Sequence, residues 1–252
     1  MKYIKQFFPS LLILLLLIFC DTKRLLPNYV FTSSNQLSDL NLLTTLTMNH
    51  SKIAYLTFDD GPSPNITPKI LDILDEENVK ATFFVIGKKV EEHSEIVKDA
   101  YYRGHYIANH TYSHDNHLLY QNADSFLKEL QKTEEAIRKA IGQDNFTSHL
   151  FRFPNGYMSP IYKTQKEKML PILESLDFCY LDWNALNNDS MKEYSSQELL
   201  HNLKQTIKDK STLVILMHDT NDVSDSSTAL KASIQYLKSQ GYLFDSLEKF
   251  FE

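Results

Sequence analysis

The feature that most constrains the fold is a regular alternation of short apolar segments with longer amphipathic ones, which begins near residue 53. The short segments have the length of strands, and they lie at 53–58, 82–86, 106–109, 149–153, 178–182, 213–217 and 242–244. The longer segments have helical periodicity, and they lie at 67–77, 93–103, 124–141, 164–176, 197–208, 228–239 and 246–251. Such alternation predicts an α/β fold with a parallel sheet and helices on its outside.

Seven strand–helix units favour a sheet closed into a barrel over an open doubly wound sheet. No glycine-rich phosphate loop follows the first strand segment, which argues against an open sheet that binds nucleotides. The chain has 252 residues, which is enough for one domain with a full hydrophobic core. We expect residues 51–252 to form this domain.

The first 24 residues differ from the rest of the chain. Basic residues flank the apolar run Leu11–Cys20, which predicts an export signal over residues 1–24. The run is shorter than the roughly 20 apolar residues of a typical membrane span, and no small-residue cleavage site precedes Asp21. Cleavage, lipidation at Cys20 and retention as a membrane anchor remain open alternatives. In each case the segment contacts the membrane during export, and we expect the domain outside the cell or anchored to the outer face of the cytoplasmic membrane.

Residues 25–50 are polar and rich in Asn, Ser and Thr, so we expect a spacer between the export segment and the domain. The chain has 26 Lys and Arg and 32 Asp and Glu; without the four basic and one acidic residues of 1–24, 22 and 31 remain. An acidic domain without a long basic run is a poor binder of nucleic acid. It suits a neutral or cationic polymer better. The oligomeric state stays open.

Polar residues with catalytic capacity follow most of the predicted strands. Because the active site of a parallel barrel lies at the carboxyl ends of its strands, these residues are expected to meet. They occur in five segments: Thr57-Phe58-Asp59-Asp60-Gly61-Pro62, His110-Thr111-Tyr112-Ser113-His114, Arg152-Phe153-Pro154-Asn155-Gly156, Asp182-Trp183-Asn184 and Leu216-Met217-His218-Asp219. Each segment alone is a weak signal, but their joint placement predicts an active site.

Two of these segments indicate metal chemistry. His110 and His114 are four residues apart, so a helical turn would present both imidazoles on one side. Two histidines and one carboxylate form an open site for a divalent metal. Of the adjacent Asp59 and Asp60, one can bind the metal while the other stays free as a base.

These motifs resemble those of the NodB-type polysaccharide deacetylases, carbohydrate esterase family four. The segment 57–62 matches the first motif of the family in full, and 110–114 matches the second, over a resemblance that spans roughly residues 50–251. The resemblance implies a distorted (β/α) barrel with fewer than eight units. It also implies hydrolysis of N-acetyl groups on an extracellular amino-sugar polymer.

The resemblance assigns the metal and its neighbouring base. Asp60, His110 and His114 are similar to the metal ligands of the family, and Asp59 is similar to its catalytic base. A site with two imidazoles suits zinc, cobalt or nickel better than magnesium or calcium, which prefer oxygen ligands. The expected cofactor is therefore a divalent metal, with zinc first.

The same resemblance assigns further roles. His218 is similar to the catalytic acid, Asp182 to the carboxylate that orients this histidine, and Arg152 to the arginine that positions the base. Trp183 is expected to wall the sugar groove, and Leu216 to lie beside the substrate.

The third motif departs from the family pattern Arg-Pro-Pro-Tyr-Gly. Pro154 is retained, but Asn155 replaces the aromatic residue whose backbone N–H helps to bind the oxyanion. A backbone donor survives a change of side chain, so the oxyanion role can persist. We expect Tyr157 to compensate for the lost aromatic ring in the groove.

The sequence leaves the polymer open. Peptidoglycan N-acetylglucosamine is the first expectation, because an exported bacterial enzyme meets that polymer first. Chitooligosaccharides, an exopolysaccharide and acetylated xylan are alternatives on the same site. An inactive polysaccharide-binding protein is the alternative of a different class.

Overall fold

The computed structural model describes residues 52–220 and 225–251. The predicted export segment and the predicted spacer lie outside the described residues. Within the described part of the chain, no helix has the length and apolar character needed to span a bilayer.

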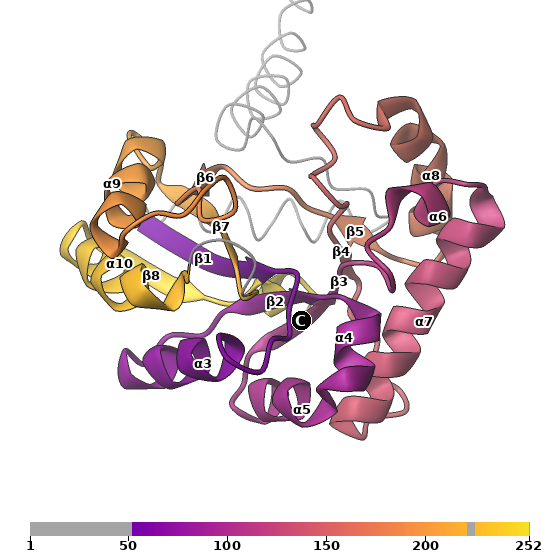
Figure 1. Cartoon of the computed structure of the whole chain (residues 1–252), viewed down its shortest axis with the longest axis horizontal. Helices are drawn as coiled ribbons and strands as arrows, with labels where there is room; N and C mark the ends of the chain where they lie inside the picture. Colours follow the sequence, from indigo (N-terminus) through magenta and orange to yellow (C-terminus); the bar gives the residue numbers. More distant parts are fainter. Residues whose placement is uncertain (1–51, 221–224, 252) are drawn as a thin grey trace, which may run out of the picture.

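Eight parallel strands form one curled sheet, which is the predicted α/β fold with a distorted barrel of about seven units (Figure 1). The strands are β1 (Lys52–Asp59), β2 (Thr82–Val85), β3 (Tyr106–Asn109), β4 (Leu150–Phe151), β5 (Cys179–Tyr180), β6 (Ala185–Leu186), β7 (Thr212–His218) and β8 (Tyr242–Asp245). Their order is β5-β4-β3-β2-β1-β7-β6, and β8 pairs with the first half of β1. All seven predicted strands are present, and only the two-residue β6 was not predicted.

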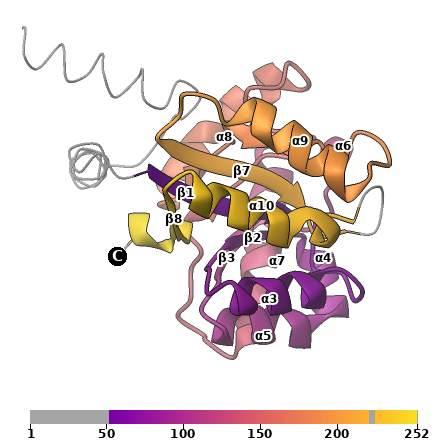
Figure 2. The same cartoon turned by 90° about the vertical axis from the view of Figure 1, so that its left-hand side faces the viewer.

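Helices cover the outside of the sheet, as Figures 1 and 2 show. They are α3 (Thr67–Glu76), α4 (Gly87–Glu92), α5 (Ser94–Tyr102), α6 (Asn116–Leu119), α7 (Ala123–Ile141), α8 (Lys163–Ser175), α9 (Ser196–Thr206), α10 (Ser227–Ser239) and the 3-10 helix η1 (Leu247–Phe250). The short α4 and α6 were not predicted. The long α7 is capped at its N-terminus by Asn122, whose side chain accepts from the backbone N–H of Ser125, and at its C-terminus by Gly142 in the left-handed conformation.

Apart from β6 and β8, the strands are largely buried on both faces, as expected for a parallel sheet covered by helices. In β1 the side chains of Ala54 and Leu56 join the core under the helices, whereas Tyr55 joins the core inside the barrel. Because successive side chains of a strand point to opposite faces, Thr57 and Asp59 also point inward. The inward face of β1 therefore changes from apolar to polar at its carboxyl end, and this places Asp59 in the mouth of the barrel.

Candidate active site

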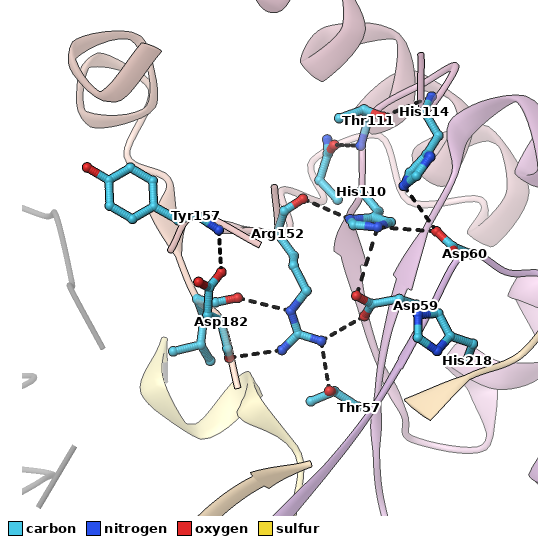
Figure 3. A network of polar contacts seen from close by, with 12 residues as sticks. Thr57, Asp59, Asp60, His110, Thr111, His114, Arg152, Tyr157, Asp182 and His218 are labelled. Atoms are coloured by element: carbon cyan, nitrogen blue, oxygen red, sulfur yellow. Dashed lines mark hydrogen bonds and ion pairs between the residues drawn. The ribbon is translucent and has the colours of Figure 1, made fainter. Parts of the chain in front are cut away.

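The first motif forms a sharp turn at the end of β1. Asp60 has a backbone φ of 72°, so the chain turns immediately after Asp59. As a result the two adjacent carboxylates have different main partners: Asp59 pairs with Arg152 and has His110 at 3.9 Å, whereas Asp60 lies 3.3 Å from both histidines (Figure 3). The two carboxylates therefore have different electrostatic surroundings although they are neighbours in sequence.

The histidine pair lies on a loop rather than on the helical turn that the four-residue spacing predicts. Thr111 and His114 have φ values of 71° and 56°, which breaks any helix. Glu129 on α7 holds the loop, because its carboxylate accepts from the backbone N–H groups of Tyr112 and Ser113 at 3.1 and 2.7 Å. The loop still brings the two imidazole rings to 5.0 Å between centroids.

Asp60, His110 and His114 together form a candidate metal site. Oδ1 of Asp60 is 3.3 Å from Nε2 of each histidine, and the three ligand atoms lie within 4.8 Å of one another. This oxygen is buried and has no hydrogen-bond partner, an arrangement that costs free energy unless a cation supplies the missing contact. Burial alone would raise the pKa of Asp60, but the nearby histidines lower it well below its usual range. The residues therefore fit a divalent metal.

The orientation of His110 supports the same conclusion. Its Nδ1 lies 2.8 Å from the carbonyl oxygen of Arg152, so Nδ1 carries the proton and donates it. The lone pair of Nε2 is then directed to Asp60. A backbone carbonyl that fixes the tautomer is the usual support of a histidine ligand.

Arg152 is fully buried and contacts Asp59, as predicted for the arginine that positions the base. Its Nη1 donates to Oδ1 of Asp59 at 2.7 Å and to Oγ1 of Thr57 at 2.8 Å. The other guanidinium nitrogens donate to the carbonyl oxygens of Leu181 and Asp182, at 3.0 and 3.2 Å. These contacts hold Asp59 as an oriented carboxylate, as Figure 3 shows.

His218 ends β7, directly beside Asp59 in the register of β1 and β7. Its Nδ1 lies 2.7 Å from Oδ1 of Asp189, and its backbone N–H donates to Oδ2 of Asp189 at 2.7 Å. Burial alone would lower the pKa of His218, but the hydrogen bond and the charge of Asp189 raise it to about 9. The imidazole is therefore protonated at neutral pH, as a general acid must be.

The prediction that Asp182 orients His218 is wrong. Asp182 follows β5, at one edge of the sheet, and its carboxylate accepts from the backbone N–H groups of Tyr157 and Met158 at 2.7 and 2.8 Å. Asp189 follows β6, which pairs with β7, and so it reaches His218. The sequence did not reveal β6, and Asp189 was missed for that reason.

Asp59, the candidate metal site and His218 thus lie together at the carboxyl ends of the strands, and comparisons with known proteins identify the family. The family model described as "Polysaccharide deacetylase" matches residues 47–174. This chain belongs to the polysaccharide deacetylase family. The peptidoglycan-N-acetylglucosamine deacetylase of Bacillus cereus is 35% identical over 206 residues, which are 81% of this chain and 70% of that protein. The peptidoglycan-N-acetylmuramic acid deacetylase PdaA of Bacillus subtilis is 32% identical over 198 residues, with 78% and 70% covered.

A solved structure supports the assignment over almost the whole described domain. The catalytic domain of peptidoglycan N-acetylglucosamine deacetylase from Eubacterium rectale superposes with a TM-score of 0.71 at 29% identity. The match covers 79% of this chain and 90% of that domain. It therefore extends beyond the residues that the family model matches.

The backbone of the third motif suits Asn155, the residue that departs from the family pattern. Asn155 is exposed and has a φ of 64°, a left-handed conformation that asparagine tolerates better than most residues. Pro154 before it is buried. Tyr157 does not replace the missing aromatic ring as we expected, because its ring packs on Phe153 and Tyr180 and points away from the metal ligands (Figure 3).

The two remaining predicted substrate residues lie inside the barrel. Leu216 is buried on β7, and its register partner on β1 is Thr57. Trp183 is half-buried, and its ring centroid is 5.7 Å from the guanidinium carbon of Arg152. Trp183 therefore lies beside Arg152, and no hydrogen bond joins it to the candidate metal ligands.

Asp219 follows His218 directly, and no role was predicted for it from the sequence. Its buried carboxylate accepts from Oγ1 of Thr67 at 2.7 Å and fills the space beside Gly61, where a Cβ atom would lie 2.0 Å from its nearest oxygen. Burial raises the pKa of this carboxyl to about 7. Asp219 thus supports the turn that carries Asp59 and Asp60, and it explains why a glycine follows them.

Proposed function

We propose that this polysaccharide deacetylase is a metal-dependent, exported enzyme that removes N-acetyl groups from an amino-sugar polymer, with peptidoglycan N-acetylglucosamine as the first candidate. The observation that carries the proposal is that the two carboxylates at the end of β1 have different contacts. Arg152 holds Asp59 as a free carboxylate, while Oδ1 of Asp60 faces two imidazoles without a hydrogen-bond donor. A free base next to a metal site is what metal-assisted hydrolysis requires.

The residues of this chain would divide the reaction as follows. Asp59, held by Arg152, takes a proton from the attacking water. His218, charged through Asp189, gives a proton to the amine of the departing sugar. A backbone N–H near Asn155 would donate to the oxyanion of the tetrahedral intermediate. The products are acetate and a free amino sugar.

A divalent metal held by Asp60, His110 and His114 would supply Lewis acidity to the acetyl carbonyl and would lower the pKa of water from about 15.7 toward about 7. The donor set of two imidazoles and one carboxylate favours zinc, cobalt or nickel. We therefore propose zinc as the first candidate.

The proposed location rests on the sequence of residues 1–24, where basic residues flank a short apolar run. The proposed polymer rests on the names of two relatives, both of which are peptidoglycan deacetylases. Export would bring the enzyme to peptidoglycan, because this polymer lies outside the cytoplasmic membrane.

Acetate release tests the proposal. The full chain is incubated with peptidoglycan, with acetylated chitooligosaccharides and with acetylated xylan, before and after chelation. We expect release from the N-acetylated glycans, loss on chelation and recovery with zinc, cobalt or nickel. Full activity in a metal-free sample contradicts the metal dependence, and release from acetylxylan alone makes the protein an esterase. No release from any polymer would favour a binding protein.

A further inference from the structure

The loop that leads to the candidate metal ligand His114 lies between α4 and α7, two helices that pack side by side (Figure 1). On the α4 side, the backbone N–H groups of Gly87 and Lys88 donate to the carbonyl oxygens of Thr111 and Tyr112, at 2.9 Å each. The fit is close, because a Cβ atom at Gly87 would lie 2.8 Å from the ring of Tyr112. One edge of the loop is therefore fixed by backbone hydrogen bonds to α4.

On the α7 side, the loop is held by a single carboxylate. Oε2 of Glu129 accepts from the backbone N–H groups of Tyr112 and Ser113 at 3.1 and 2.7 Å, and from Oγ of Ser113 at 2.9 Å. Glu129 is buried, with 9% of its surface exposed. Hydrogen bonds to a charged acceptor are stronger than those to a neutral one. The contact with Glu129 therefore fixes the second edge of the loop.

The loop needs such support because part of its backbone is strained. Thr111 and His114 have φ values of 71° and 56°, a conformation that is unfavourable for residues with a Cβ atom and most of all for a β-branched one. Strained conformations persist only where the surrounding structure determines them. Without Glu129 the N–H groups between these two residues would lose their acceptor, and the loop would relax. Relaxation would move the imidazole of His114 relative to Asp60.

The two histidines depend on this loop to different extents. His110 follows β3 directly, its backbone N–H donates to the carbonyl oxygen of Val85 at 3.0 Å, and its ring is bound to the carbonyl oxygen of Arg152. The backbone N–H of His114 instead donates to Oγ1 of Thr111, within the loop itself, at 3.1 Å. The side chain of His114 is 30% exposed, whereas that of His110 is 3% exposed. A loosened loop would therefore displace His114 and leave His110 in place.

We propose that Glu129 is a positioning residue of the metal site, which fixes the imidazole of His114 beside Asp60 before a metal binds. It acts through the backbone of residues 112 and 113 rather than through a contact with the metal. The inference rests on the proposed function, because the candidate ligands hold a metal only under that proposal. It goes further in assigning part of the metal affinity to a buried carboxylate on α7 and to one of the two histidines.

The zinc affinity of the full chain, freed of metal and measured in competition with a chromophoric chelator, tests the proposal. Glu129→Leu should raise the Kd for zinc about tenfold or more, because residues that hold metal ligands in place typically contribute 10–100-fold to affinity. Glu129→Gln should stay within about threefold of the wild type, because its amide oxygen can accept the same hydrogen bonds. An equal loss in both variants would make the effect one of charge and would overturn the positioning role.

A double-mutant cycle identifies the ligand through which Glu129 acts. In a His114→Ala background, Glu129→Leu should change the Kd by less than about twofold, because the imidazole that it positions is gone. In an Asp60→Asn background, the same substitution should still raise the Kd about tenfold. Equal effects in the two backgrounds would overturn the action through His114.

Melting temperatures of the metal-free variants separate positioning from a general loss of stability. Leu237→Ala is the control, because Leu237 is fully buried on α10, which packs on α3, α9 and β8. This variant should have a lower melting temperature, since it leaves a cavity in the core, but the Kd of the wild type. A rise in Kd equal to that of Glu129→Leu would show that any destabilisation weakens the site, and the proposal would fall.

Acetate release by the wild type, measured in parallel, separates this proposal from the proposed function. Zinc binding and acetate release, with an unchanged Kd in Glu129→Leu, remove the positioning role and leave the metal-dependent deacetylase. Zinc binding that depends on Glu129, without acetate release from any glycan, leaves the positioned metal site and removes the proposed reaction.

Discussion

Asp189→Asn tests whether one buried carboxylate sets the charge of the proposed catalytic acid. The side chains of His218 and Asp189 are 14% and 2% exposed, and their contact is 2.7 Å. Asparagine has nearly the shape of aspartate and keeps one oxygen that can accept from Nδ1, but its NH2 group then faces the backbone N–H of His218, which Oδ2 of Asp189 accepts in the wild type. The substitution therefore removes the charge and one backbone hydrogen bond, and it keeps the hydrogen bond that orients the imidazole.

The size of the effect follows from the pKa of His218, which is about 9 because the hydrogen bond and the charge of Asp189 raise it, together with the charges of Asp59 and Asp60. Without Asp189, burial lowers this pKa and only the charges of Asp59 and Asp60 still raise it. A fall of the pKa by about one unit lowers the protonated fraction at high pH about tenfold, so acid-dependent turnover at about pH 10 should fall at least about tenfold.

The direction of the pH dependence is fixed by the role of His218. A general acid acts only when protonated, so the activity of the wild type should decline as the pH rises through about 9. In Asp189→Asn the same decline should occur at a clearly lower pH than in the wild type, because the main cause that raises the pKa of His218 is removed. The assay is kcat/KM for acetate release between pH 5 and 10, with metal content measured in each sample.

Asp182→Asn is the matched control. Its carboxylate contacts the backbone of residues 157 and 158 and not His218, so the decline should stay near pH 9 even if turnover falls. A decline that stays near pH 9 in Asp189→Asn would refute the reasoning. A decline that moves only in Asp182→Asn would restore the assignment made from the sequence.

Four further outcomes are expected. Asp60→Asn should weaken metal binding and recover part of its activity at high metal concentration, as metal content and turnover would show. Asp59→Asn should keep the metal but lose about 10²–10⁴-fold in kcat, because it removes a positioned base; loss of metal in this variant would make Asp59 a ligand. Gly61→Ala should destabilise the fold by about 1–3 kcal/mol in urea unfolding, because the new Cβ meets the Asp219 carboxylate. Residues 51–252 without the export segment should fold and release acetate; an inactive product beside an active full chain contradicts the predicted boundary.

The sequence predicted the fold well because each main strand carries its own signal. Strands of four or more residues, such as β1 and β7, show apolar runs that periodicity detects. The equally short β4 and β5 lie within the apolar segments 149–153 and 178–182, whereas β6 lies between Asn184 and Asn187 and has no apolar run of its own. The assignment of Asp182 to His218 failed for this reason: without β6, no strand brought the following Asp189 to the site.

The site residues were predicted more reliably than their local conformation. His110 and His114 do lie together, but a loop with two left-handed residues brings them there instead of a helical turn. The sequence spacing limits how far apart they lie, whereas the carboxylate of Glu129 on α7 holds the loop. A contact that depends on a residue 15 or more positions away cannot be read from local spacing.

The contacts of the adjacent aspartates favour Asp60 over Asp59 as the proposed metal ligand. Arg152 binds Oδ1 of Asp59 in a buried ion pair, and breaking such a pair typically costs about 3–5 kcal/mol, so only Oδ2 of Asp59, 3.9 Å from Nε2 of His110, is open to a second cation. Oδ1 of Asp60 has no hydrogen bond to lose, because it is buried without a donor. A metal at Asp60 therefore gains a ligand at little cost, and the same metal at Asp59 would have to compete with a guanidinium. The two residues have identical side chains, and it is the buried Arg152, directly after β4, that favours Asp59 as the proposed base and Asp60 as the proposed metal ligand.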